Sequence, residues 1–321
     1  MDSSRPKVAI LGTRFDDFDL ERGVLGDVEV VFGPGRDRSE VVGVASGADV
    51  ILAGAAPRFD AETLQELNCP AIVRLGVGVD SVDLEAARQR GMWVSYVPDY
   101  GTEAVALHAV TLILAAIRRL PMADRHIRTG AWGFAHLRPL HLPASLAVGV
   151  VGYGRIGRRV ADMLAGVGFE RFLVCDPLVE EVASGTLCSL KELLSRADVV
   201  TLHAPPKVGG HLLGSSELEA MRPRSVLVNT ARGALIDTPA LVDALEKGRP
   251  AIAALDVFEN EPPDIGMLEP VADRLILTPH MSWYTEETEL ELRRQGAEEA
   301  RRILNGEPPL HPIVSPTEAS V

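Results

Sequence analysis

The hydrophobic positions in the first hundred residues fall into short apolar runs that are separated by more polar segments. Runs of this length are typical of buried β-strands, and the segments between them have the spacing of amphipathic helices. The predicted strands are 8–11, 28–32, 49–53, 71–75 and 93–97, and the clearest predicted helices are 61–67 and 84–90. Strands that alternate with helices in this way form a parallel sheet with helices on both faces.

A second alternation of strands and helices follows a central apolar segment. The central segment predicts a helix over Thr102–Leu120 that Pro121 stops, and then an irregular arm over His126–Pro143. The second set of predicted strands is 147–151, 172–175, 198–203, 225–229, 251–256 and 275–278, and the last predicted helix is 286–304. Asn305–Pro309 breaks this helix, and we expect the tail beyond it to be loose.

A glycine-rich turn joins the strand at 147–151 to a helix. Its glycines are Gly152, Gly154 and Gly157, and the next strand ends in Asp176, 176 − 157 = 19 residues later. This context is the dinucleotide fingerprint, in which the glycines allow a tight turn, close approach of the pyrophosphate and close packing of helix on strand. The positive end of the helix then attracts the phosphates. The alternative is an ordinary glycine-rich connection.

Asp176 indicates which dinucleotide would bind. Its carboxylate can accept hydrogen bonds from ribose hydroxyls and would repel a 2′-phosphate, so the sequence favours NAD over NADP. No arginine follows Asp176 directly, which also disfavours NADP. A turn residue at a strand end, before Pro177, is the alternative interpretation.

Three side chains with complementary chemistry follow three successive predicted strands: Arg232, Glu261 and His280. Arginine can bind a carboxylate through two hydrogen bonds, and an imidazole can carry a proton. Glu261 can hold the imidazole in place and favour its charged form. The alternatives are a structural ion pair for Arg232, a solvated loop acid for Glu261, with Glu259 as a nearby competitor, and a strand cap for His280.

Composition narrows the class of protein further. A net charge of −13 and a pI of about 5.1 argue against a nucleic-acid-binding surface, although a pocket can still attract an anionic substrate. Cys69, Cys175 and Cys188 lack the spacing of a disulfide framework or a zinc site, so no metal is predicted. The N-terminus has no apolar signal core, and 104–117 is too short to span a bilayer, so we expect a cytoplasmic protein without a membrane partner.

Taken together, these motifs make the chain resemble the D-isomer-specific 2-hydroxyacid dehydrogenases from about residue 8 to about residue 312. The motifs are Gly76–Asp80, Gly152–Gly157, Leu202–Pro205, Asn229–Gly233, Leu255–Phe258 and Thr278–His280. The chain is most similar to the subgroup related to C-terminal-binding proteins, through Val97–Thr102 and His280–Tyr284.

The resemblance implies a role for individual residues. It makes Arg232 the anchor for the substrate carboxylate and keto oxygen, His280 the general acid and Glu261 its partner. The implied substrate contacts are Arg74, Val77, Gly78 and Trp283, where Arg74 could equally be a surface pair and Trp283 a core or interface aromatic. The implied cofactor contacts are Thr102, Gly152, Gly154, Arg155, Ile156, Gly157, Asp176, His203, Pro205, Thr230, Arg232 and Asp256.

The resemblance also implies an architecture of two doubly wound α/β domains with parallel sheets. We expect a flavodoxin-like substrate domain from residues 1–100 and 285–321, and a Rossmann NAD domain from residues 101–284 inserted between them, with hinges near 99–101 and 282–286. A homodimer is implied, built largely through the NAD domain and the arm after Leu120.

The expected activity is that of an NAD-dependent oxidoreductase acting on CH–OH groups, which moves a hydride between NADH and a small 2-keto acid. Two alternatives stay open: an NADH-responsive binding protein similar to a corepressor, and a dehydrogenase of the phosphite type. The chain departs from its relatives at Leu107, where many carry an acidic residue, and in the loop Pro206–His211. The departure in the loop Pro206–His211 could alter the rim of the cofactor cleft.

Overall fold

The computed structural model describes residues 5–15, 17–206 and 209–316, and the chain divides into two compact units. The first unit contains the residues up to Gly101 and those from Thr285 onward, and the second unit is Thr102–Tyr284. The sequence predicts the first break after residue 100, and the contacts place it after Gly101. Each unit is a sheet of mainly parallel strands covered by helices, as the alternation of apolar and polar segments predicts.

The sheet of the first unit has the strand order β13-β5-β4-β3-β1-β2. Its strands are β1 (Lys7–Leu11), β2 (Glu29–Gly33), β3 (Val50–Ala53), β4 (Ala71–Arg74), β5 (Trp93–Tyr96) and β13 (Pro312–Val314). Its helices are α1 (Asp19–Leu25), α2 (Arg38–Ala45), α3 (Ala61–Glu66), α4 (Leu84–Gln89) and α12 (Glu286–Leu304). Asp37, Asp60 and Asp83 start α2, α3 and α4 by accepting a hydrogen bond from the backbone N–H three residues ahead.

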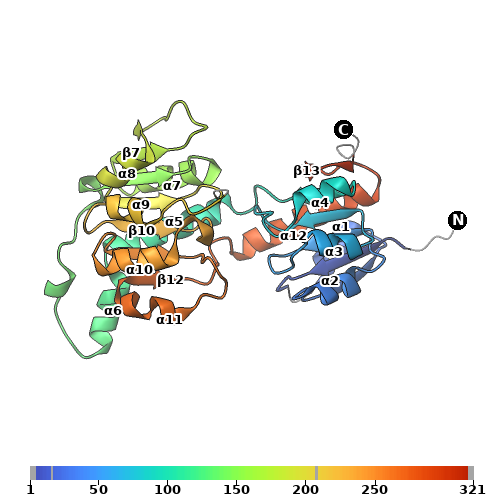
Figure 1. Ribbon diagram of the computed structural model, residues 1–321, viewed down its shortest axis with the longest axis horizontal. Coiled ribbons are helices and arrows are strands. Elements are labelled where there is room, and N and C mark those ends of the chain that lie inside the picture. The colour runs from blue at the N-terminus through green and yellow to red at the C-terminus, as the bar shows by residue number, and fades with distance from the viewer. Residues whose placement is uncertain (1–4, 16, 207–208, 317–321) are drawn as a thin grey trace. The chain divides into compact units, whose positions relative to one another are not determined.

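The tail after α12 is ordered, so the expectation of a loose segment is wrong for the residues up to 316. β13 pairs with β5 in antiparallel orientation at the edge of the sheet (Figure 1). The buried carboxylate of Glu299 on α12 accepts hydrogen bonds from the Leu310 backbone N–H and from His311 Nδ1, both at 2.8 Å. A buried carboxylate needs such partners, so Glu299 ties the tail to the helix.

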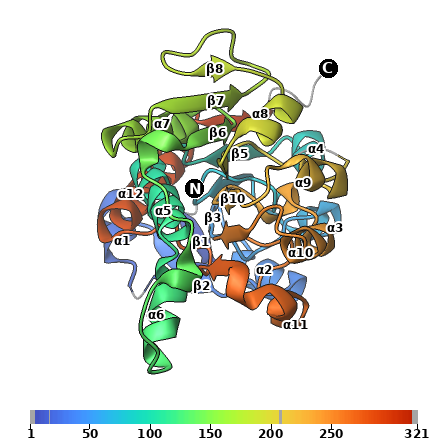
Figure 2. The same cartoon turned by 90° about the vertical axis from the view of Figure 1, so that its left-hand side faces the viewer.

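The sheet of the second unit has the order β12-β11-β10-β9-β6-β7-β8, and its strand pairs are parallel. The strands are β6 (Ala147–Val151), β7 (Arg171–Cys175), β8 (Thr186–Leu187), β9 (Val199–Leu202), β10 (Val226–Asn229), β11 (Ile252–Leu255) and β12 (Leu275–Leu277). Helices α5 (Thr102–Ile117) and α7 (Arg155–Gly166) cover one face. Helices α8 (Leu190–Arg196), α9 (Ser215–Ala220), α10 (Thr238–Glu246) and α11 (Ile265–Leu268) cover the other (Figure 2).

Alternate residues of these strands enter two separate cores. On β10, Val226 and Val228 pack under α5 and α7, whereas Leu227 packs under the opposite helices. Because both faces are buried, each strand is a continuous apolar run rather than an alternating one. This explains why short apolar runs predict the strands of this unit well, while the two-residue strand β8 has too little pattern to be predicted.

Pro121 begins a helix rather than ending one. The central helix α5 stops at Ile117, Arg119 adopts a left-handed φ of 52°, and α6 (Leu120–Arg128) starts with Pro121 in its first turn. Proline is well tolerated there because its missing N–H would have no partner in the first turn. The predicted arm therefore starts as a helix, and short 3-10 turns follow at Ala135–Leu137 and Pro143–Ser145.

A helix that crosses a membrane must be both long and apolar. No single helix in residues 5–15, 17–206 and 209–316 is both long and apolar enough. Helices α5 and α6 meet the length and composition requirement only as a pair, and they join at a bend of 57°.

A buried ion pair holds α12 against α1 in the first unit. Arg293 Nε and Nη2 donate to the two carboxylate oxygens of Glu21, each at 2.8 Å, and these side chains are 7% and 1% exposed. Hydrogen bonding to Glu21 raises the pKa of Arg293. The guanidinium also donates to the Asp17 carbonyl oxygen and lies 4.7 Å from the ring centroid of Phe15.

Arg293→Met should lower the free energy of unfolding by about 3–5 kcal/mol, because Glu21 would be left buried without its partner. Urea denaturation followed by circular dichroism would measure this. The control is Arg294→Met on the same helix, which removes exposed pairs with Glu291 and Glu298 and should cost less than about 1 kcal/mol. Equal destabilisation by the two variants would contradict the assignment.

Candidate active site

Three neighbouring strands of the second unit end at the same edge of the sheet. Asn229 of β10 pairs in register with Leu255 of β11, which pairs with Leu277 of β12. Arg232, Glu261 and His280 therefore follow the carboxyl ends of adjacent parallel strands. This is the edge at which open α/β sheets bind their ligands.

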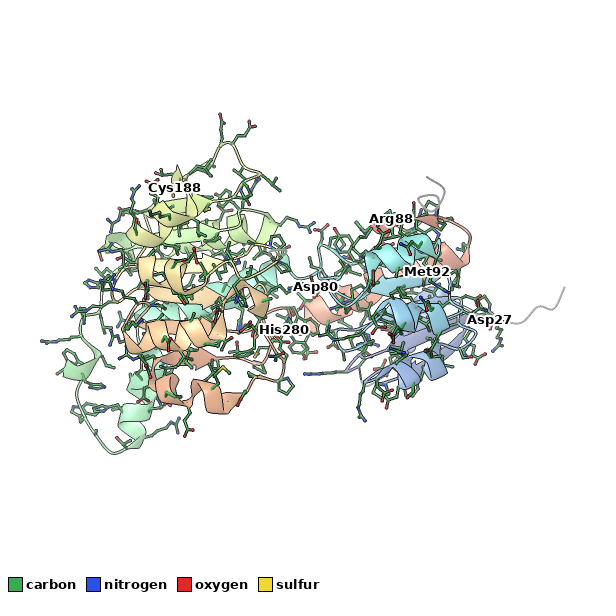
Figure 3. The ribbon with its side chains drawn as sticks, in the orientation of Figure 1. Asp27, Asp80, Arg88, Met92, Cys188 and His280 are labelled. Atoms are coloured by element: carbon green, nitrogen blue, oxygen red, sulfur yellow. The ribbon has the colours of Figure 1, made fainter. Side chains whose placement is uncertain are left out.

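His280 and Glu261 form a hydrogen-bonded pair, with 2.7 Å between His280 Nδ1 and Glu261 Oε2. The second carboxylate oxygen accepts the backbone N–H of Phe258 at 3.1 Å. Partial burial acts to raise the pKa of Glu261, but the hydrogen bond and charge of His280 outweigh it, so the net pKa is lower than usual. An ionised Glu261 fixes the orientation of the ring, and His280 Nε2 is then the nitrogen that can exchange a proton with a ligand. The side chain of His280 appears in Figure 3, and it is 40% exposed.

The loop that carries His280 is organised around Asp256, whose carboxylate is 0% exposed. The carboxylate accepts hydrogen bonds from Thr278 Oγ1 at 2.6 Å and from the backbone N–H groups of Met281 and Ser282 at 3.0 and 2.9 Å. The His280 N–H donates to the Asp256 carbonyl oxygen at 2.8 Å. These bonds hold His280 in the left-handed region, with a φ of 52°, which non-glycine residues adopt only when their surroundings impose it.

Asp256 is among the predicted cofactor contacts, and the structure shows what its carboxylate does within the protein. Its carboxylate is enclosed by its own loop and by His108 of α5, whose Nε2 lies 3.6 Å from Asp256 Oδ1 and 3.1 Å from Thr278 Oγ1. In this structure Asp256 orders the turn that carries His280, with His108 as an additional partner that motif reasoning did not identify.

Arg232 lies in a loop that packs directly on the loop carrying Glu261. The amide of Asn229 shapes the loop, because its oxygen accepts the Ala231 N–H at 3.0 Å and its nitrogen donates to the Arg232 carbonyl oxygen at 2.8 Å. A Cβ on the next residue, Gly233, would lie 1.8 Å from the carbonyl carbon of Phe258, so only glycine permits this approach. Glycine at 233 thus brings the Arg232 loop against the backbone of Phe258 and Glu259.

The glycine-rich turn has the geometry that a dinucleotide requires. Gly152 has a φ of 88°, and a Cβ there would lie 2.6 Å from the Ala204 backbone nitrogen. A Cβ on Gly157 would lie 2.1 Å from the Gly152 carbonyl oxygen, whereas one on Gly154 would meet nothing within 4 Å. The turn is therefore tight where helix packs on strand and open at the start of α7, where a pyrophosphate would approach.

Two polar side chains that follow strands of the same sheet suit a bound nucleotide. Asp176 follows β7, and its carboxylate accepts the Tyr153 N–H at 2.6 Å and the Leu178 N–H at 2.8 Å, so it is fixed at the rim of the turn. Thr230 Oγ1 is buried and has no hydrogen-bond partner in the described part of the protein. A buried hydroxyl without a partner is costly, and a ligand contact would supply one.

The other predicted cofactor residues occupy different environments. Thr102 and Arg155 begin α5 and α7, Ile156 packs partly into the core under these helices, and Pro205 is exposed. His203 follows β9, and its Nε2 lies 2.9 Å from Thr201 Oγ1. Burial lowers the pKa of His203 to about 3, so its ring is neutral near pH 7.

The predicted substrate residues are distributed over both units. In the first unit, Arg74 ends β4 and its Nη1 donates to the Leu75 carbonyl oxygen. Gly76 follows with a φ of 139°, and Val77 is 42% exposed, with half-buried Gly78 beside it. In the second unit, Trp283 is half-buried and packs edge-to-face on Tyr284, with 5.6 Å between ring centroids.

From the sequence, Glu259 is an alternative to Glu261 as the partner of His280. In the structure the two carboxylates have different partners. Glu261 binds His280, while Glu259 Oε1 lies 2.6 Å from His211 Nε2. No motif in the sequence signals the contact of His211 with Glu259. In the part of the chain that the structure describes, no group of three or more His, Cys, Asp or Glu side chains is arranged to hold a metal ion.

Comparison with known proteins agrees with this geometry. Residues 110–282 match the family described as "D-isomer specific 2-hydroxyacid dehydrogenase, NAD binding domain". The chain belongs to the D-isomer-specific 2-hydroxyacid dehydrogenase family, and its second unit contains the NAD-binding domain of that family.

Two similar proteins illustrate the range of activities that relatives are named for. The D-3-phosphoglycerate dehydrogenase of Archaeoglobus fulgidus is 35% identical over 289 residues, which is 88% of this chain and 54% of the relative. The glyoxylate reductase of Aeropyrum pernix is 35% identical over 278 residues, which is 83% of this chain and 82% of the relative. The chain thus spans about half the length of the D-3-phosphoglycerate dehydrogenases that it matches.

Solved structures similar to this chain have the same fold. The TT0316 protein of Thermus thermophilus superposes with a TM-score of 0.87 at 35% identity, covering 96% of this chain and 100% of that one. The D-lactate dehydrogenase of Aquifex aeolicus, complexed with NAD and lactic acid, superposes with a TM-score of 0.85 at 26% identity, covering 94% and 96%.

His203 should remain uncharged in the folded protein from about pH 8 down to about pH 4, because its pKa is about 3. In the unfolded chain it would gain a proton near pH 6.5. The folded state therefore loses stability through this group as the pH falls from about 6.5 toward about 3. An NMR titration, assigned by comparison with His203→Gln, would test this, and a His203 midpoint near pH 6.5 would contradict it.

Proposed function

We propose that this chain is an NAD-dependent D-2-hydroxyacid dehydrogenase that transfers a hydride reversibly between NADH and a small 2-keto acid. The proposal rests on the 2.7 Å hydrogen bond between His280 and Glu261 at the strand edge that Arg232 shares. Membership of the family and the geometry of the Gly152–Gly157 turn support the same activity.

The residues of the second unit divide the chemistry between them. When bound, NADH supplies the hydride. The Gly152–Gly157 turn and the start of α7 would hold its pyrophosphate, and Asp176 would bind its ribose hydroxyls. The Arg232 guanidinium anchors the substrate carboxylate and stabilises negative charge on the keto oxygen. His280 Nε2 gives its proton to that oxygen, while Glu261 holds Nδ1, and in the reverse direction His280 takes the proton back.

The substrate class follows from the anchor and from the names of relatives. Arg232 selects a carboxylate beside the reacting carbon. We propose Trp283 as a further substrate contact in the second unit, and Arg74, Val77 and Gly78 as substrate contacts in the first unit. Relatives act, by name, on D-3-phosphoglycerate or glyoxylate. The substrates to test are therefore glyoxylate, pyruvate, hydroxypyruvate and the keto acid that corresponds to 3-phosphoglycerate, each with NADH and with NADPH.

His280→Ala should lower kcat for keto-acid reduction by roughly 10²–10⁴-fold, because both the proton donor and the partner of Glu261 are removed. The affinity for NADH should stay within about twofold, since His280 lies outside the glycine-rich turn that positions the pyrophosphate. Steady-state NADH oxidation and a fluorescence titration with NADH would measure these quantities.

Two outcomes would contradict the proposal in different ways. Unchanged turnover in His280→Ala would remove this histidine from the reaction. Tight NADH binding by the unmodified chain, without turnover of any acid in the panel, would instead favour an NADH-responsive binding role like that of the C-terminal-binding proteins.

We also infer that the arm after α5 forms a homodimer interface. Five large apolar side chains of α6 and the following segment are at least half exposed: Leu120, Ile127, Trp132, Phe134 and Leu142, with Trp132 at 91%. An exposed apolar surface of this kind is typical of an interaction site. The family resemblance favours a second copy of the chain as the partner.

Replacing Trp132 and Phe134 together by serine should convert a dimer to a monomer, because the exposed aromatic rings of the arm would be lost from the interface. Analytical ultracentrifugation would give the mass. Leu178→Ser is the matched control, because Leu178 is also 91% exposed but lies outside the arm. A dimer that survives the double substitution would contradict the inferred interface.

A further inference from the structure

A second histidine–carboxylate pair involves the loop that carries Glu261. His211 Nε2 is 2.6 Å from Glu259 Oε1, and Glu259 precedes Glu261 by two residues. The other ring nitrogen, His211 Nδ1, lies 3.8 Å from Asp237 Oδ2. The side chains of His211 and Glu259 are 34% and 27% exposed. The chemistry proposed above uses neither of them.

Glu259 connects three segments of the second unit. Its Oε1 meets His211, which lies in the connection from β9 to α9, and its Oε2 accepts the backbone N–H of Thr238 at 2.9 Å. Thr238 is the first residue of α10, and Asp237 caps that helix by accepting the Ala240 N–H. Burial acts to raise the pKa of Glu259, but the bonds from Thr238 and His211 outweigh it and the net pKa is lowered. The carboxylate is therefore ionised near pH 7, and a donor at His211 meets a charged acceptor.

The segment that Glu259 ties down is the one that aims Glu261. Phe258 donates its N–H to Glu261 Oε1, and its carbonyl carbon sits against Gly233. Glu259 is the next residue, so the contacts of its side chain fix the course of the backbone between Phe258 and Glu261. Movement at Glu259 would displace Glu261, and with it the 2.7 Å hydrogen bond to His280.

We propose that His211 is a positioning residue: by donating a hydrogen bond to Glu259, it holds the 256–262 loop so that Glu261 keeps His280 oriented for proton transfer. This role rests on the proposed dehydrogenase function. The same bond links the loop to the segment after β9, where the predicted cofactor contacts His203 and Pro205 lie. His211 thus joins the cofactor side of the second unit to its acid–base pair.

Stability and catalysis should respond differently to the loss of this bond. A partly exposed ion pair contributes at most about 1 kcal/mol to folding. Displacement of a catalytic group by about 1 Å can cost up to about 10² in rate. A residue that only stabilises the fold would lower the melting temperature without a selective effect on kcat.

The test compares His211→Leu with His211→Gln. Leucine removes the donor, whereas the glutamine amide can donate from nearly the position of imidazole Nε2. We expect His211→Leu to lower kcat roughly tenfold, with the KM values for keto acid and NADH within about twofold and little loss of stability. His211→Gln should keep kcat within about twofold of the unmodified chain, because the donor remains.

Hydrogen–deuterium exchange of the peptide spanning 256–262 gives a readout that needs no turnover. Compared with the unmodified chain, we expect faster exchange of this peptide in His211→Leu and the same exchange rate in His211→Gln. If the two variants lose kcat equally, or if loop exchange and kcat are unchanged in His211→Leu, the positioning role is wrong. If the unmodified chain reduces no keto acid, the proposed function fails, and exchange alone then decides whether His211 holds the loop.

Discussion

The carboxylate of Asp256 is completely buried, and the geometry of the candidate active site depends on how it is satisfied. A buried carboxylate needs several hydrogen bonds, and here the partners are Thr278 Oγ1 and the N–H groups of Met281 and Ser282. These donors come from both sides of His280, so satisfying the carboxylate bends the chain at that residue into the left-handed region. The side chain of His280 then meets Glu261. The hydrogen bonds of the buried Asp256 carboxylate therefore position the partly exposed His280–Glu261 pair, which can exchange a proton.

Around this constraint, the second unit uses close backbone contacts where its loops must meet. Gly233 allows the Arg232 loop to touch Phe258, and Gly157 allows α7 to pack on the turn at Gly152. In both places a single methyl group would force the backbone apart. The result places Arg232 and the glycine-rich turn of the NAD-binding domain each at the carboxyl end of a parallel strand.

The two glutamates of the loop after β11 illustrate how neighbouring residues acquire separate tasks. Glu261 faces His280, and Glu259 faces His211 and the start of α10. Both carboxyls have lowered pKa values although burial opposes ionisation in each, because hydrogen bonds to the charged form prevail. The loop is held at two points because both carboxylates are fixed by hydrogen bonds. This suits a segment that must keep Glu261 aligned with His280.

The pattern of apolar runs determined the two α/β alternations, most strand positions and the edge to which Arg232, Glu261 and His280 belong. That information is local, because a strand buried on both faces needs an apolar run and a parallel connection needs a helix. The start of a new helix at Pro121, the pairing of β13 with β5 and the burial of Asp256 were decided only by tertiary structure. So was the choice of Glu261 rather than Glu259 as the partner of His280. These features depend on contacts between residues far apart in the chain, and no local pattern records which distant group will satisfy a buried charge or cover a sheet edge.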